Sequence, residues 1–332
     1  MGHRVLAVAA GFLGMAWGVY GAATPPDGFL LERDKVAADA RAVTAERFPD
    51  ADQVLVDDHV LEIVAKDGTS VVWDDEYAKV LTEKGRRDAS SHQMMFNLHY
   101  GTTFVYRAEI IKPDGRVVAI DPEAYSRVMT EPGQMGSNIY DPNNKILSFS
   151  MPGVEVGDLC HLVTCRITSK TRMPDTWADY TVFEYDSPIV NLLYAVSMPP
   201  ELPIRSRVLR APISNTVAYA ESRQPDGRTL HTWTVRNVPQ MFPEPDMPPL
   251  YTQVQRLILS SIDDWRTVSR WYWKLCEPAL AKTTPEMQET VNRLIADATT
   301  RDEKIRRIFK FVSQHIRYMG LTTEETAPGY EP

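Results

Sequence analysis

Residues 66–81, KDGTSVVWDDEYAKVL, contain a turn followed by a strand-like run. The turn, Lys66-Asp67-Gly68, favours a hairpin because its glycine adopts positive φ without a steric cost. The run from Val71 to Leu81 is rich in β-branched and aromatic residues, which pack well on a pleated sheet. This stretch therefore predicts a β-hairpin.

The same pattern recurs along much of the chain. Pro113-Asp114-Gly115 and Pro225-Asp226-Gly227 predict two further hairpins. Phe29 to Arg47, rich in alanine and charged residues, predicts a helix before the strands. Strand-like runs occupy residues 93–111, 116–120, 158–169, 180–185, 192–197, 204–209 and 229–235. We expect a mainly β chain, α+β overall, built on an antiparallel β-sandwich or a large twisted sheet.

Residues from about 255 to 320 show helical periodicity instead. Thr300 with Glu303 forms a capping-box pattern, and the apolar residues that follow recur at three- and four-residue intervals to about Tyr318. Thr284 before Pro285 marks the start of a second helix, and Asp264 marks a third. We expect Trp265 and Tyr272 of that third helix to pack in a core.

A proline-rich segment marks the main domain boundary. Residues 239–249, PQMFPEPDMPP, cannot continue a helix or a central strand, because proline lacks an amide donor and restrains its predecessor. The predicted parts are an N-terminal helix or linker (24–47), a β domain (48–238), a connector (239–254) and a helical segment (255–332). Residues 1–23 combine a basic start, an apolar stretch and small residues at 21–23, which is typical of a cleaved signal peptide. A retained anchor is the alternative.

The charge excludes one class of protein, and the cysteine content limits disulfide bonding. The formal net charge is −8 and no basic run exceeds two residues, which excludes a nucleic-acid-binding protein. Three cysteines allow at most one disulfide bond. Cys160 and Cys165 share a predicted strand at an odd separation and therefore point to opposite faces. Cys160 and His161 are also directed apart, so they do not form a nucleophile and its base.

Two other polar groups resemble sites, and a structural role is the better interpretation of each. Asp141 to Asn144 lacks the glycine and the distal glutamate of an EF-hand and predicts a turn. The acidic groups Asp57-Asp58, Asp74-Asp75-Glu76 and Asp263-Asp264 are assigned to solvated faces and a helix start. The sequence thus predicts no catalytic, cofactor-binding or metal-binding residue in this chain, and no cofactor.

A family resemblance accounts for both halves of the chain. Residues 308–318, IFKFVSQHIRY, resemble the start of the bacterial transglutaminase-like core, a papain-like cysteine fold. Residues 46–240 resemble the domain of unknown function that commonly precedes such a core in secreted bacterial proteins. The matching motifs are FPDAD (48–52), KVLTEKG (79–85), IKPDGR (111–116) and MPGVEVGD (151–158). The resemblance implies a catalytic Cys, His and Asp, and we expect them beyond Pro332.

The resemblance also implies a function. The chain is expected to be the non-catalytic N-terminal accessory or substrate-positioning part of an exported, periplasmic or extracellular transglutaminase-like protein. Its partner would be the peptide or protein whose amides the parent acts on, and no membrane span remains after signal cleavage. The alternative is a stand-alone secreted β-sandwich module that binds a peptide or a glycan. The reaction, the ligand and the oligomeric state stay open.

Overall fold

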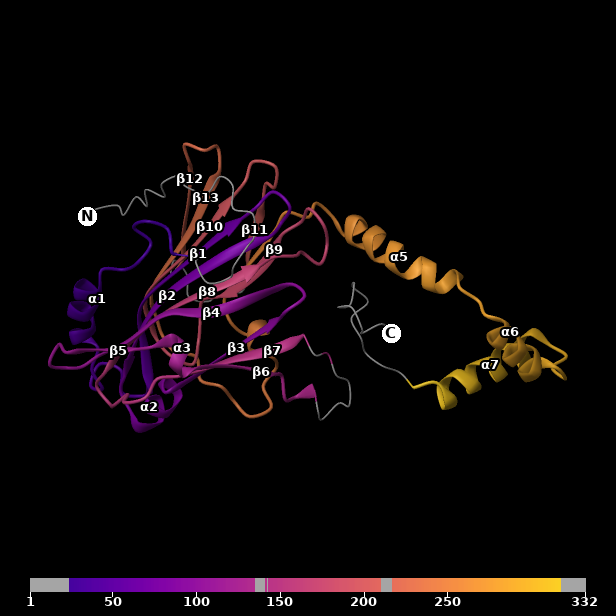
Figure 1. Cartoon of the computed structure of the whole chain (residues 1–332), viewed down its shortest axis with the longest axis horizontal. Helices are drawn as coiled ribbons and strands as arrows, with labels where there is room; N and C mark the ends of the chain where they lie inside the picture. Colours follow the sequence, from indigo (N-terminus) through magenta and orange to yellow (C-terminus); the bar gives the residue numbers. More distant parts are fainter. Residues whose placement is uncertain (1–23, 135–140, 142, 210–216, 318–332) are drawn as a thin grey trace. The chain divides into compact units, whose positions relative to one another are not determined.

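The computed structural model describes residues 24–134, 141, 143–209 and 217–317 (Figure 1). The chain forms a β unit (residues 1–132 and 142–262) and a helical unit (residues 133–141 and 263–332). The predicted signal peptide, residues 1–23, lies outside the described residues. Strands account for 39% of the chain and helices for 24%, which confirms the predicted mainly β class.

An eight-stranded sheet forms the centre of the β unit. Its strand order is β12-β13-β10-β1-β2-β8-β4-β5 (Figure 1). The strands are β1 (Gln53–Val64), β2 (Ser70–Val80), β4 (Gly101–Ile111), β5 (Val117–Ile120), β8 (Leu159–Thr168), β10 (Ile189–Met198), β12 (Val217–Arg223) and β13 (Thr229–Val238). Neighbouring strands are antiparallel except β1 and β10, which pair in parallel. The large sheet is therefore observed, with one parallel pair that the sequence did not predict.

All three predicted hairpins are confirmed. They connect β1 to β2, β4 to β5 and β12 to β13. The glycine of each turn has positive φ, between 85° and 88°. At Gly68 a side chain is also excluded, because a Cβ would lie 2.0 Å from the carbonyl oxygen of Thr176.

Two three-stranded sheets cover one face of the large sheet. One contains β3 (Ser91–Asn97), β7 (Asn144–Ser150) and β6 (Ser126–Thr130), and the other β11 (Arg205–Leu209), β14 (Arg256–Ser260) and β9 (Ala178–Val182). Phe149 of β7 packs with Leu162 of β8 in one core cluster. Leu257 of β14 packs with Val235 of β13 in another.

Strand register shows that these clusters share a face. One row of directly paired residues crosses six strands: Val235, Leu192, Asp58, Glu76, Leu162 and Ala108. Directly paired residues project to the same side of a sheet. The ends of this row are apolar and lie under the small sheets, whereas its centre carries two acids. We call this side the open face and the other the closed face.

The N-terminal segment covers the closed face. It contains α1 (Arg33–Asp39) and the 3-10 helix η1 (Ala40–Ala42), a shorter helical region than residues 29–47 predicted. Phe29 packs with Leu61 and Trp73, and Val36 packs with Tyr77. The remaining short helices of the β unit are α2 (Glu83–Ala89), α3 (Pro122–Tyr125) and the 3-10 helix η2 (Leu250–Thr252).

The helical unit contains α5 (Trp265–Ala281), α6 (Pro285–Ile295) and α7 (Arg301–His315). Asp264, Thr284 and Thr300 cap these helices as predicted, and Thr300 with Glu303 completes the capping box. Helical structure begins at Trp265 rather than near residue 255, because residues 256–260 form β14. The prediction that Trp265 and Tyr272 lie in a core is wrong, since Trp265 is 84% exposed and Tyr272 is also exposed.

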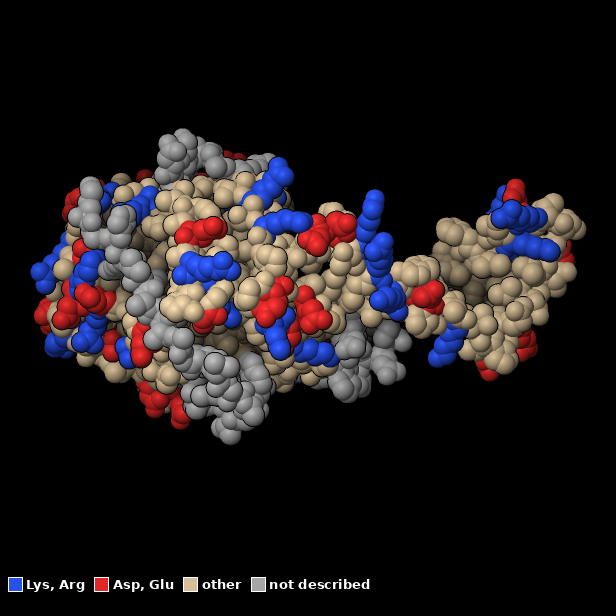
Figure 2. Space-filling model, turned by 90° about the horizontal axis from the view of Figure 1, so that it is seen from above, with Lys and Arg blue, Asp and Glu red and all other residues tan. Residues whose placement is uncertain are grey.

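Charged side chains are distributed rather than segregated. Figure 2 shows Lys and Arg interspersed with Asp and Glu over the visible surface of the β unit. Among the helices of the described residues, none is both long and apolar enough to cross a membrane.

Candidate functional site

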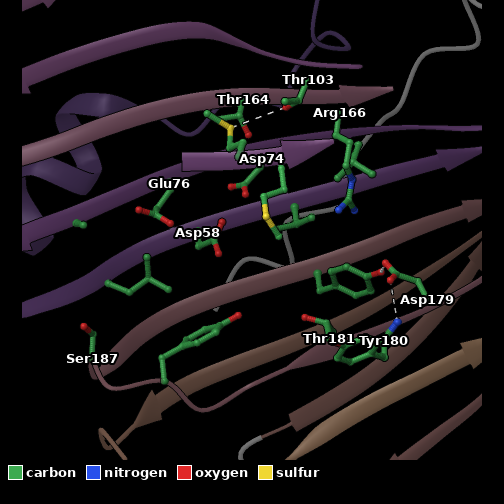
Figure 3. Close-up of a pocket in the computed structure, with 18 of the residues that line it drawn as sticks. Asp58, Asp74, Glu76, Thr103, Thr164, Arg166, Asp179, Tyr180, Thr181 and Ser187 are labelled. Carbon is green, nitrogen blue, oxygen red and sulfur yellow. Dashed lines mark hydrogen bonds between the residues drawn. The ribbon is translucent and has the colours of Figure 1, made fainter. Parts of the chain in front are cut away.

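A cavity of about 670 Å³ lies on the open face. Strands β1, β2 and β8 form its floor, and β9 and the following loop to Ser187 line one side (Figure 3). Met94 and Met95 of β3 also line it. Small-molecule sites in proteins typically have volumes of roughly 300–1,000 Å³. The cavity therefore has the size of a ligand site.

Three carboxylates converge on the cavity floor. Asp58 of β1 is paired with Glu76 of β2, and the next position along the same face places Asp74 opposite Val60. Figure 3 shows the Asp58, Asp74 and Glu76 carboxylates pointing into the same space. Asp58 is only 7% exposed. Within the described part of the chain, no group hydrogen-bonds Oδ1 of Asp58 or Oδ1 of Asp74.

Burial and mutual repulsion favour the neutral forms of these acids. Burial, the charges of Asp74 and Glu76 and a hydrogen bond with Asp74 raise the pKa of Asp58 well above its usual value. Burial raises the pKa of Asp74 to about 6, although the hydrogen bond with Asp58 opposes the rise. Burial and the charge of Asp74 raise the pKa of Glu76 to about 7. The cluster can therefore take up or release protons near neutral pH.

A second group of charges lies on the same face and includes a cation. Arg166 of β8 and Asp179 of β9 line the cavity, and the Tyr194 hydroxyl donates to Asp179 Oδ2 at 3.3 Å. Glu62 accepts a hydrogen bond from Trp177 Nε1 at 2.8 Å. Burial and the charge of Asp179 raise the pKa of Glu62 to about 7. The charge of Arg166 lowers the pKa of Glu62 and that of Asp179. The charge of Arg166 is thus shared among neighbouring acids.

The closed face carries a paired network instead. His161 of β8 is 1% exposed and contacts Asp75 Oδ1 through Nε2 at 2.8 Å and Glu109 Oε2 through Nδ1 at 3.0 Å. Both partners accept, so both ring nitrogens donate and the imidazole is charged. Burial opposes this charge, but the two carboxylates raise the pKa of His161 overall. Tyr77 stacks on the ring at 4.0 Å, and Leu31 N donates to Asp75 Oδ2 at 2.7 Å.

The cysteine predictions are confirmed. Cys160 and Cys165 are free and buried in different core clusters, on opposite faces of β8. Cys160 packs near Ile110, whereas His161 contacts Asp75 on the closed face. Burial raises the pKa of both thiols to about 12, which disfavours the reactive thiolate.

The assignment of the acidic groups to solvated faces is wrong for two of the three. Asp57 and Asp58 are buried, as is Asp75, and Asp74 and Glu76 line the cavity. The helix-start assignment is correct for Asp264, which caps α5. The hairpin offers a sequence signal for the convergence, since Asp58 and Glu76 both lie nine residues from Asp67 and therefore face one another.

No metal site is evident where residues are described. Asn143 lies in a turn next to β7, and Asn97 donates from Nδ2 to Asn144 Oδ1 at 2.7 Å. Across the described ranges, no three His, Cys, Asp or Glu side chains are grouped as metal ligands.

Comparison with known families identifies the family of this chain. The sequence profile of the family described as "Domain of Unknown Function with solved-structure structure (DUF3857)" matches residues 66–242. The chain belongs to this family. The match includes Asp74, Glu76, Arg166 and Asp179 of the cavity, while Asp58 precedes it. No curated protein matches the sequence.

Solved structures support the fold. The chain is similar to a "putative protease" from Parabacteroides distasonis, with a TM-score of 0.64 and 16% identity, over 79% of this chain and 50% of that protein. The chain thus spans half the length of that protein, and likeness at this identity shows the fold alone. An M1 zinc metallopeptidase from Deinococcus radiodurans matches with a TM-score of 0.32 and 11% identity, over 63% of this chain and 42% of that one. That similarity supports no argument about function.

Proposed function

We propose that this chain is the non-catalytic, substrate-positioning part of an exported transglutaminase-like protein that acts on peptide or protein amides. The cavity on the open face is its binding site. Of the residues that resemble a transglutaminase-like core, Ile308 to His315 lie in α7, which follows the β unit and the first two helices of the helical unit along the chain. The fold it shares with a protein named as a putative protease, over half of that protein, is consistent with a role beside a peptide-cleaving centre.

The observation that carries the proposal is the cavity itself. Buried, partly unpartnered carboxylates in a cavity of about 670 Å³ are costly to maintain, because a buried acid without compensation destabilises the fold. Groups that destabilise a fold without a structural role are typical of binding and catalytic sites. We therefore place the substrate in this cavity.

The state of the two buried thiols and of His161 supports a non-catalytic role. Cys160 and Cys165 are buried thiols with raised pKa values. His161 holds both of its ring nitrogens against carboxylates, so neither is free to accept a proton from a nucleophile. We expect the chain to bind peptides without cleaving or modifying them.

Binding to peptide and glycan arrays tests the proposal. We expect peptides to bind and the cavity-filling variant Thr164→Trp to lose binding, because Thr164 lines the cavity floor. The matched variant Ser222→Trp on the exposed strand β12 should bind as the unaltered chain does. Glycan binding without peptide binding would support the stand-alone module instead.

Incubation of the chain with glutamine-containing peptides tests the non-catalytic assignment. We expect neither ammonia release nor peptide cleavage. Turnover that disappears in Cys160→Ala would show that the chain carries its own nucleophile and would contradict the assignment.

A further inference from the structure

The acidic end of the cavity has a chemical preference that the proposed function leaves open. Five lining residues are acidic and, among those described, one is basic; the acids are Asp58, Asp74, Glu76, Asp179 and Asp186, and the base is Arg166. Arg166 acts on Asp74, Asp179 and the nearby Glu62. The excess of acids favours a cationic ligand.

We propose that the cavity binds the protonated side chain of a lysine in a peptide, with its ammonium group held by Asp58, Asp74 and Glu76. The inference rests on the proposed function, since it names the part of the substrate that this site recognises.

Hydrogen-bonding geometry favours an ammonium over a guanidinium group. Asp58 and Asp74 lie diagonally across β1 and β2, and Oδ1 of each has no hydrogen-bond partner among the described residues. A guanidinium prefers both oxygens of one carboxylate, in a planar fork. An ammonium donates three hydrogen bonds to separate acceptors, which suits single oxygens from neighbouring carboxylates.

The walls suit the stem of lysine. Val60 and Val72 lie beside the acids on the same floor, and Met94 and Met95 also line the cavity. A lysine stem packs along apolar surface while its ammonium reaches polar groups. Methionine adapts to stems of different orientation, because its side chain is flexible and polarisable.

Proton release should accompany binding. The raised pKa values of Asp74 and Glu76 mean that these acids are partly protonated near pH 6.5 in the empty cavity. The groups that face them are Asp58 from β1, Tyr185 from the loop after β9 and Arg166 from β8, and the charge of Asp75 acts on Asp74 from the closed face. An ammonium favours the ionised acids, so it displaces protons to solvent, and affinity rises with pH by about tenfold per proton released per pH unit.

The test is calorimetric titration of the whole chain with matched heptapeptides that carry a central lysine, arginine, ε-N-acetyl-lysine or norleucine. We expect the lysine peptide to bind at least about tenfold more tightly than the acetyl-lysine and norleucine peptides, because a charge-assisted hydrogen bond contributes a factor of this order. Affinity should rise between about pH 5.5 and pH 8, with proton release detected in buffers of different ionisation enthalpy.

Two variants test whether Asp58 binds the ammonium group. Asp58→Asn should weaken the lysine peptide by about tenfold and leave the norleucine peptide unchanged. Asp27→Asn removes a charge from an exposed position outside the cavity and should leave both unchanged. Thermal unfolding of Asp58→Asn checks folding, and its midpoint should not fall, because the variant removes an acid whose burial is unfavourable.

The other outcomes separate the two proposals. Equal affinity for the lysine and norleucine peptides would overturn the ammonium inference while leaving peptide binding intact. Putrescine that competes as tightly as the lysine peptide would identify a free amine as the ligand and overturn the peptide part. Absence of binding by every peptide would overturn the proposed function itself.

Discussion

Asp74 and Asp75 are neighbours on β2, yet the two faces of the sheet treat their carboxylates differently. On the closed face, Asp75 accepts hydrogen bonds from His161 and from Leu31 N, beneath the N-terminal segment. On the open face, Asp74 meets Asp58 and Glu76 in a cavity, and its pKa rises. The same residue type is thus compensated on one face and repelled on the other.

This difference separates structural charges from candidate functional ones. Burying an ion is costly unless a counter-charge and hydrogen bonds compensate it. The closed face supplies both, so its network joins the N-terminal segment to β2, β4 and β8. The open face supplies no counter-charge to Asp58, so its acids retain protons unless a cation binds. Three predictions test this contrast, from the largest expected effect to the smallest.

The closed-face network should be sensitive to loss of one partner. We expect Asp75→Ala to lower the free energy of unfolding by about 3–5 kcal/mol, because it leaves His161 buried without its partner. Denaturant unfolding measures the change. The double variant Asp75→Leu, His161→Phe should lose less than the sum of the single variants, since it removes both charges together. A loss of less than about 1 kcal/mol in the free energy of unfolding for Asp75→Ala would contradict the proposed difference between the two faces.

The open-face acids should respond in the opposite direction. We expect Asp74→Asn to raise the free energy of unfolding by about 2 kcal/mol near pH 8, because it removes a buried charge that its neighbours repel. A raised carboxyl pKa means that the native state binds the extra proton, so stability falls as pH rises from about 4 to about 6. Near pH 3 Asp74 is protonated in both the folded and the unfolded state, and the gain should vanish. A loss of stability at both pH values would show that Asp74 is a structural residue.

The smallest effect on the free energy of unfolding should come from Glu109, in the closed-face network. We expect Glu109→Gln to cost about 1 kcal/mol and to lower the pKa of His161, because one of its two carboxylates becomes neutral. Stability from a raised histidine pKa is fully present below its unfolded value, near pH 6.5, and is lost as pH rises through the folded value. The cost should therefore shrink at alkaline pH. Proton NMR of the ring follows the titration, and an unchanged His161 pKa would contradict the assignment.

Much of the fold could be predicted from local sequence. The three Asp-Gly turns specify hairpins because only a few residues adopt positive φ without strain. The caps of α5, α6 and α7 could also be predicted, since Asp264, Thr284 and Thr300 each satisfy an amide within three residues. The parallel pairing of β1 with β10 could not, because nothing local to either strand selects a partner more than one hundred residues away.

The cavity was missed for a related reason. Alternation along β1 and β2 gives the side of the sheet on which Asp58 and Asp74 project, but it does not show whether that side is exposed to solvent. Their burial comes from β3 and β9, which belong to the two small sheets and pack on the same face. Acids on strands are most often solvated, so the sequence alone favoured the wrong assignment.

The sequence by itself determined the hairpins, the helix caps, the separation of Cys160 from His161 and the mainly β class, because each depends on turn chemistry or on the two-residue period of a strand. Only the tertiary structure decided which acids are paired and which face one another. That choice depends on what covers each face of the sheet. The N-terminal segment and Glu109 accompany Asp75 and His161 on one face, whereas two small sheets leave a cavity over Asp58, Asp74 and Glu76 on the other.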